Sequence, residues 1–211
     1  MTQTRYRDIE TLRLEFEEKK HIIRDRLDAF RRIPREEHFY ELAYCLLTPQ
    51  SSAVHAGAAV EALRKARCFD RPARSAEILR RNTHYVRFHN TKAARLADAW
   101  EHFPAVAERL ATGASGNDQR TWLVQNVGGF GWKEASHFLR NIGYRDLAIL
   151  DRHILRNLTN HGVLATLPKT LTPRRYRSIE NRFRRFARAV GITMDELDLL
   201  FWSRETGQIL K

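Results

Sequence analysis

The chain has few cysteines and no long apolar run. Its 211 residues include only Cys45 and Cys68, too few for this chain to supply a four-cysteine iron–sulfur cluster, and a structural disulfide is not expected in a cytosolic chain. No apolar stretch approaches the roughly 20 residues that cross a membrane. Residues 1–20 lack the apolar core of a secretion signal. We therefore expect a cytoplasmic protein with no membrane-spanning segment.

Acidic residues are also scarce compared with basic ones. The chain has 37 Lys and Arg against 25 Asp and Glu, a formal net charge of +12. Such an excess favours a polyanionic partner, because each phosphate that is neutralised releases condensed counterions. Nucleic acid is the first candidate and an anionic membrane surface is the second. A charged, solvated surface without a partner is the plain alternative, and the charge alone does not decide among these.

Apolar residues recur with helical spacing through nearly the whole chain, and no segment alternates as a strand does. The pattern predicts helices over about 9–30, 36–47, 53–66, 91–100, 118–127, 174–190 and 195–202. Proline interrupts the second of these after Thr48, and Ser51 or Ser52 is the candidate N-cap of the third. We therefore predict an all-α fold, a single unit over residues 1–211 made of two helical lobes with a groove between them.

The most informative stretch joins two short predicted helices through glycines. Gly128-Gly129-Phe130-Gly131 follows an apolar helix end, and the next helix begins at about Trp132. Glycine permits a tight reversal and a close approach to a ligand, and the free N–H groups at the start of the second helix can bind a phosphate. Residues 118–142 thus form a candidate phosphate-binding hairpin, with Gly129 and Gly131 as candidate DNA contacts. An ordinary helix–helix turn is the alternative.

The motif GGFGWKEA resembles the helix-hairpin-helix of the DNA glycosylase superfamily. KEASHFLRNIGYRDLAILDRHI resembles more narrowly the archaeal and bacterial 8-oxoguanine DNA glycosylase/AP lyase family of the second type. LLTPQSSAVHA, RFHNTKAARL and LDLLFWSRETGQILK are similar to the same family, so the resemblance extends from about Phe39 to the last residue. It implies a DNA-binding cleft between the lobes and an enzyme that excises 8-oxoguanine from duplex DNA and then cleaves the abasic site.

Two residues have the spacing of a glycosylase that is also a lyase. In the lyase-competent members of that superfamily a lysine lies two residues after the last hairpin glycine, and an aspartate follows about one helix and one loop later. Lys133 and Asp151 occupy these places, so the resemblance implies that Lys133 is the nucleophile and Asp151 its partner carboxylate. A carboxylate can stabilise a cationic sugar, and a lysine amine can form an imine that permits β-elimination. We also expect Asp151 to cap the helix that begins at Arg152.

An attacking lysine must be neutral. With an ordinary pKa near 10.4, only about one lysine in a few thousand is neutral at pH 7. We therefore expect Lys133 to be partly desolvated, at a helix start whose dipole disfavours an ammonium group.

Further residues are candidate contacts to DNA or to the damaged base. Gln50 lies in a turn from which related glycosylases contact DNA, and a helix cap is the alternative. Phe88 and Trp202 can stack on a flipped base or belong to the core. Asp198 can accept from a base edge or face solvent. Lys211 ends a tail that resembles the family's, in which the terminal lysine recognises the lesion; a frayed end is the alternative.

The predicted helix over 174–190 is crowded with arginines. A solvated helix face is the default interpretation, with phosphate contacts by some of them. The arginines are Arg174, Arg175, Arg177, Arg182, Arg184, Arg185 and Arg188.

We expect no cofactor and no catalytic metal, because His153 and His161 form no convincing ligand set with Asp151. The resemblance leaves room for a monovalent cation on the hairpin carbonyls. The expected partner is double-stranded DNA containing 8-oxoguanine, bound by a monomer. Two alternatives stay open: a glycosylase/lyase for another oxidised base, and a non-catalytic helix-hairpin-helix module that only binds DNA.

Overall fold

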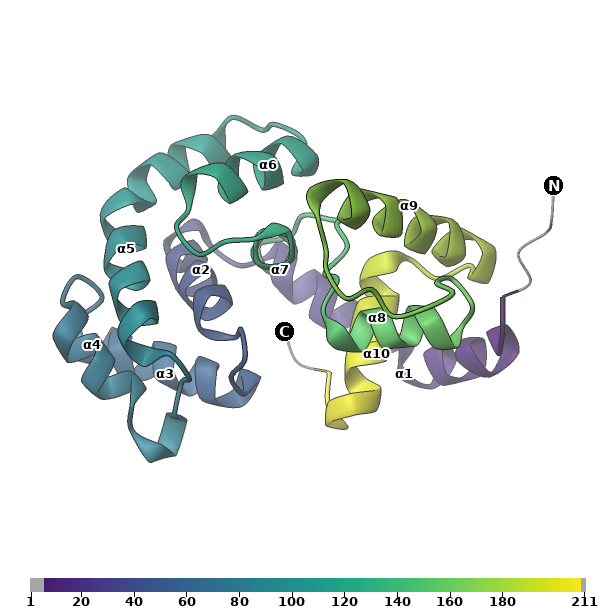
Figure 1. Cartoon of the computed structure of the whole chain (residues 1–211), viewed down its shortest axis with the longest axis horizontal. Helices are drawn as coiled ribbons and strands as arrows, with labels where there is room; N and C mark the ends of the chain where they lie inside the picture. Colours follow the sequence, from purple (N-terminus) through teal and green to yellow (C-terminus); the bar gives the residue numbers. More distant parts are fainter. Residues whose placement is uncertain (1–5, 210–211) are drawn as a thin grey trace. The chain divides into compact units, whose positions relative to one another are not determined.

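A computed structural model describes residues 6–209, and every regular element in that range is helical (Figure 1). The predicted all-α fold is therefore confirmed. Within this range no helix is both long enough and apolar enough to cross a membrane. The elements are α1 (Ile9–Arg31), η1 (Arg35–Glu37), α2 (His38–Leu47), α3 (Ala53–Ala66), α4 (Pro72–Leu79), η2 (Asn82–His84), α5 (His89–Ala111), α6 (Gly116–Asn126), α7 (Trp132–Asn141), α8 (Arg152–Asn160), α9 (Pro173–Val190) and α10 (Met194–Thr206).

The chain divides into two compact units, in agreement with the prediction of two lobes. The central unit comprises residues 34–138, and the terminal unit combines residues 1–33 with 139–211. The division falls within α7, so this helix contributes residues to both units. The predicted DNA-binding cleft between the lobes stays a prediction.

The core of the central unit forms around α2, which packs against α3 and α5. Phe39 on α2 is buried at the centre of an aromatic cluster. Its ring meets four others edge-on, at centroid distances from 4.7 to 5.7 Å, and these belong to Tyr40, Phe69, Trp100 and Phe103. Edge-on contacts between aromatic rings add about 0.5–1.5 kcal/mol each beyond the burial of their area. This cluster joins α2, α5 and the loop before α4 into one core.

In the terminal unit α10 is the central helix and packs against α1, α8 and α9. The face predicted for α9 is the buried one, and it consists of Tyr176, Ile179, Phe183, Phe186 and Val190 with two neighbours, Glu180 and Ala187. The helix ends where Gly191 adopts a left-handed conformation with φ of 81°, which glycine takes without strain.

Two helices differ from the sequence prediction. α4 was not predicted, because a segment of only 8 residues carries too short a periodic signal. α5 was predicted to end at about Trp100, but it continues to Ala111 with Pro104 inside it. The buried face of α5 continues beyond the predicted end through Val106, and packing of that face offsets the helix-breaking effect of proline.

Candidate active site

The hairpin between α6 and α7 requires glycine at one position for two reasons. Gly129 has a φ of 91°, and a Cβ placed there would lie 2.6 Å from Cδ of Arg95. Gly131 donates its N–H to Oε2 of Glu134 at 3.1 Å, so this carboxylate caps the start of α7. The turn is therefore tight, and Arg95 of α5 packs directly against it.

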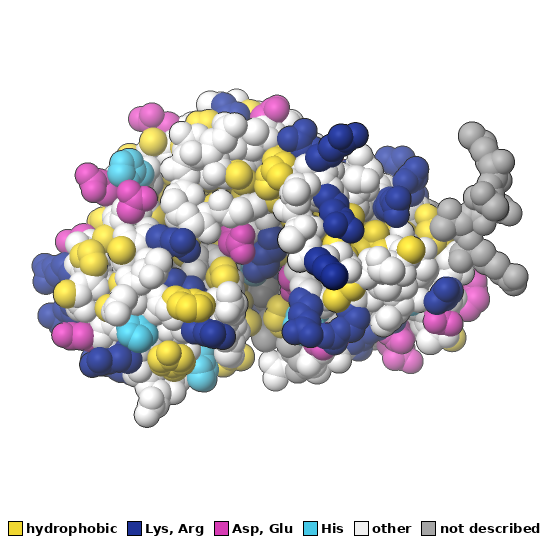
Figure 2. All heavy atoms as spheres, in the orientation of Figure 1, with side chains coloured by type: hydrophobic (Ala, Val, Ile, Leu, Met, Phe, Trp, Pro, Cys, Tyr) yellow, Lys and Arg dark blue, Asp and Glu magenta, His cyan; other side chains and the backbone are white. Residues whose placement is uncertain are grey.

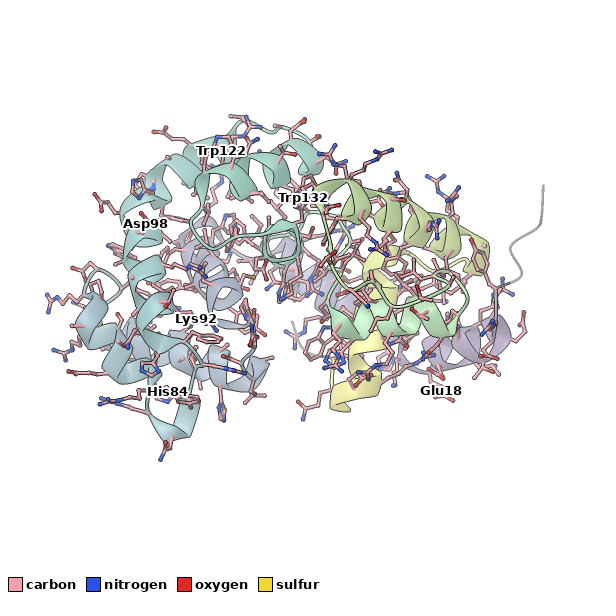
Figure 3. The ribbon with its side chains drawn as sticks, in the orientation of Figure 1. Glu18, His84, Lys92, Asp98, Trp122 and Trp132 are labelled. Carbon is pink, nitrogen blue, oxygen red and sulfur yellow. The ribbon has the colours of Figure 1, made fainter. Side chains whose placement is uncertain are left out.

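A buried arginine holds the two helices of the hairpin together. Arg120 on α6 is only 1% exposed, and it donates hydrogen bonds to Oγ of Ser136 at 3.1 Å and Oδ1 of Asn117 at 2.8 Å. Its guanidinium group lies 4.8 Å from the ring centroid of Trp132, in a cation–π contact (Trp132 is labelled in Figure 3). Arg120 was not predicted as a site residue, because an arginine on a helix gives no local sign that it is buried.

Lys133 lies in the first turn of α7, directly after the hairpin. Its side chain is 23% exposed, and its Nζ lies 3.8 Å from Oε1 of Glu134. The side chain as a whole is therefore largely buried, at a helix N-terminus, and whether this burial activates the amine stays a prediction. Its remaining exposure leaves it accessible to a reactant.

Asp151 begins α8 as its N-cap, as predicted. Its Oδ1 accepts the N–H of Ile154 at 2.8 Å, and its Oδ2 accepts the indole Nε1–H of Trp202 at 3.1 Å. Because each oxygen accepts one hydrogen bond, the orientation of the carboxylate is fixed while further lone pairs stay available. The structure therefore confirms Asp151 as a helix cap, and its catalytic role stays a prediction.

The two aromatic candidates have different environments. Trp202 is half-buried, and it contacts Asp151 as well as the ring of His153, at a centroid distance of 5.5 Å. Phe88 is 49% exposed and has a left-handed φ of 60° at the start of α5, with the guanidinium group of Arg87 4.9 Å from its ring centroid. Phe88 is therefore not a core residue. Whether either ring stacks on a base stays a prediction.

Gln50 lies at the tip of the turn between α2 and α3. It is exposed and adopts a left-handed φ of 56°, an unfavourable conformation for a residue with a side chain. Ser52, one of the two predicted candidates, is the N-cap of α3 and accepts the N–H of His55 at 3.4 Å. Gln50 is therefore not that helix cap, and its side chain is directed away from the core.

A buried lysine that the sequence analysis did not single out holds this turn in place. Lys92 on α5 is 3% exposed (labelled in Figure 3). Its Nζ donates to the carbonyl oxygens of Leu47 and Pro49, both at 2.7 Å, and to Oγ of Ser51 at 3.2 Å. Burial lowers the pKa of Lys92 from 10.5 to about 8, with smaller contributions from the cations Lys133 and Arg95. Lys92 thus links the turn electrostatically to the region of Lys133.

The two remaining candidates for contacts to the damaged base are Asp198 and Lys211. Asp198 is buried in the terminal unit, where its Oδ2 accepts from Nη1 of Arg140 at 3.1 Å. It therefore does not face solvent, and whether it contacts a base edge stays a prediction. Lys211 lies outside the described residues.

The helical fold and its glycine hairpin define a helix-hairpin-helix protein, with a partly buried lysine directly after the hairpin. Residues 23–192 match the model of the family described as 8-oxoguanine DNA glycosylase, and the chain belongs to that family.

Individual relatives agree with this assignment over nearly the whole chain. The 8-oxoguanine DNA glycosylase/AP lyase of Fusobacterium nucleatum is 39% identical over 206 residues, which cover 93% of this chain and 94% of the relative. That of Korarchaeum cryptofilum is 36% identical, covering 96% of each chain. The crystal structure of the Methanocaldococcus jannaschii 8-oxoguanine glycosylase/lyase in complex with a 15mer DNA containing 8-oxoguanine has a TM-score of 0.85 and 33% identity, covering 95% of this chain and 100% of that one.

Proposed function

We propose that this protein is a bifunctional DNA repair enzyme. It excises 8-oxoguanine from duplex DNA and then cleaves the abasic site by β-elimination. The observation that supports this best is Lys133, a partly buried amine directly after a glycine hairpin in a chain of the 8-oxoguanine DNA glycosylase family. A protein that only binds DNA has no need of such a lysine.

In the proposed mechanism the damaged nucleotide is flipped out of the duplex. The carboxylate of Asp151 stabilises the positive charge that develops on the sugar as the N-glycosidic bond breaks. The amine of Lys133 attacks C1′, and the base leaves with the bonding electrons and takes up a proton. The sugar ring then opens: the C1′–O4′ bond breaks, O4′ takes up a proton, and the nitrogen of Lys133 forms an imine with C1′ that acidifies the C2′ proton. Removal of that proton expels the 3′ phosphate, and hydrolysis of the imine then frees Lys133.

The other residues have supporting roles in this proposal. Gly129 and Gly131 bring the hairpin backbone close to a phosphate, and Gln50 contacts the DNA from its exposed turn. Phe88 and Trp202 supply aromatic surface for the flipped base, and Lys211 recognises its modified edge. We further propose that the enzyme acts as a monomer in the cytoplasm, on double-stranded DNA.

Borohydride reduction tests the imine directly. A duplex with one 8-oxoguanine should give a covalent protein–DNA adduct, whereas undamaged and thymine-glycol duplexes should give little. Lys133→Gln should abolish the adduct and keep DNA binding. Lys65→Gln, which changes an exposed lysine on α3, serves as the matched control and should trap normally.

Each alternative has its own outcome in this experiment. Stronger trapping on the thymine-glycol duplex would indicate an enzyme for oxidised pyrimidines. Binding without an adduct on any lesion would indicate a non-catalytic module. A normal adduct from Lys133→Gln would show that another amine is the nucleophile.

A further inference from the structure

The outer surface of α9, in the terminal unit, is basic and has no exposed carboxylate. From Arg152 to Met194 the chain has a single acidic residue, Glu180, and this stretch supplies most of the net charge of +12. Glu180 is buried and accepts the N–H of Ala148 at 2.8 Å, so it does not offset the charge outside. Figure 2 shows Lys and Arg side chains gathered over α9. The outer surface of α9 therefore presents cationic and uncharged side chains.

Two adjoining hollows lie where α9 meets residues 159–168. Their volumes are about 190 and about 730 Å³, and both are lined by Leu164, Ala165 and Arg182. Because they share these residues, the two hollows lie side by side, and we treat them together as one surface. We call it the arginine groove; its lining has no carboxylate and contains Arg7, Arg175, Arg182 and Arg185.

The four guanidinium groups are available to an outside anion. All four residues are exposed, and none makes an ion pair with another residue in the range 6–209. Arg184 on the same helix shows the contrast, because its Nε lies 2.8 Å from Oδ2 of Asp146. An arginine that is already paired must break its ion pair before it can bind an outside anion. The four arginines of the groove have no ion pair to break.

The spacing of the groove suits a row of phosphates better than a single small anion. Arg175, Arg182 and Arg185 follow one another at seven and three residues, so they lie on one side of α9. Ten residues of α-helix span about 15 Å, which is the rise of about four base pairs of duplex DNA. Arginine binds phosphate with two parallel hydrogen bonds. The matching ligand is therefore the backbone of a nucleic acid.

Helix α8 separates this groove from the candidate catalytic carboxylate. Asp151 caps the first end of α8, whereas Thr159 and Asn160 at its other end line the groove. The 9 residues of α8 correspond to about 13 Å. We propose that the arginine groove binds the phosphate backbone of the same duplex at a flank of the lesion. This inference rests on the proposed function, and it adds a contact surface beyond the hairpin.

A matched pair of double variants tests the groove. Arg182→Gln/Arg185→Gln removes two charges from the groove, and Arg174→Gln/Arg188→Gln removes two from exposed residues of the same helix that do not line it. Affinity is measured by fluorescence anisotropy against salt concentration. The ligands are duplexes of about 8 and about 30 base pairs, roughly 27 and 100 Å long, each with a central 8-oxoguanine, so the short one extends only about 13 Å to either side of the lesion.

The groove variant should bind the long duplex roughly tenfold more weakly than wild type at moderate salt, and the slope of log K against log salt should fall by about 1.8, or 0.9 per lost phosphate contact. Its affinity for the short duplex should change much less. Protection of the amides of residues 159–168 from hydrogen exchange should appear only with the long duplex.

Equal weakening by both double variants would mean that net charge alone matters and would overturn the groove. A loss that does not depend on duplex length would overturn the flank assignment, as would wild-type affinity in the groove variant. Failure of the proposed function is a separate result, because then wild-type protein would release no 8-oxoguanine from either duplex.

Discussion

Replacing Lys92 with methionine should destabilise the protein, and the structure gives an estimate of how much. Methionine fills a similar volume but donates no hydrogen bond, so the carbonyls of Leu47 and Pro49 lose the donor that lies 2.7 Å away. A buried acceptor without a partner costs about 1–3 kcal/mol. The contact to Leu47 is buried and that to Pro49 is only part-buried, so losing both costs about 2–4 kcal/mol, partly offset because the variant no longer buries an ammonium group.

The stability difference between wild type and Lys92→Met should also change with pH in a definite direction, which a simple packing defect would not produce. Because burial lowers the pKa of Lys92 from 10.5 to about 8, the folded chain releases this proton at lower pH than the unfolded chain does. Between about pH 8 and 10.5 the unfolded state binds more protons, so raising the pH favours folding. The gain approaches about 3 kcal/mol over the whole window. Methionine does not titrate, so the stability difference between wild type and variant should widen as the pH rises.

Urea unfolding followed by fluorescence at pH 7, 8, 9 and 10 measures this difference. Lys65→Met on the exposed side of α3 is the control and should stay close to wild type at every pH. A difference between wild type and Lys92→Met that stays flat or shrinks from pH 8 to 10 would refute the assignment of a lowered pKa to Lys92. A variant as stable as wild type at all pH values would refute the role of its hydrogen bonds.

Three further predictions concern the site. Asp151→Asn keeps an acceptor for the N–H of Ile154 but loses the hydrogen bond from Trp202. The melting temperature should therefore fall only by a few degrees, while single-turnover excision falls by orders of magnitude; near-normal excision would make Asp151 purely structural. Gly129→Ala would strain a φ of 91° and crowd Arg95, so duplex binding should weaken in anisotropy assays. Gly57→Ala is the control, because its Cβ would be 3.9 Å from Cε2 of Tyr44; it should leave binding unchanged and stabilise α3 by about 0.5–1 kcal/mol. Deleting Lys211 should slow 8-oxoguanine excision much more than cleavage at a preformed abasic site; equal rates for wild type and the deletion in both assays would remove Lys211 from the lesion pocket.

The sequence alone determined the features that depend on neighbours a few residues apart. Helical spacing predicted the all-α fold and the buried face of α9, because apolar residues recur every 3.6 residues in any helix that buries one side. Glycines predicted the tight hairpin before α7. The capping role of Asp151 was also local, since its partner is the N–H only three residues later.

The tertiary structure decided which polar side chains are buried and what they bind. Lys92 reaches a carbonyl 45 residues away, Trp202 binds Asp151 across 51 residues, and Asp198 pairs with Arg140 across 58. Periodicity shows which side of a helix is buried, but it does not show which helix packs against that side. A buried polar group needs a partner, and that partner is known only once the helices have packed. For this reason the turn held by Lys92, the enclosure of Asp198 and the arginine groove all required the fold.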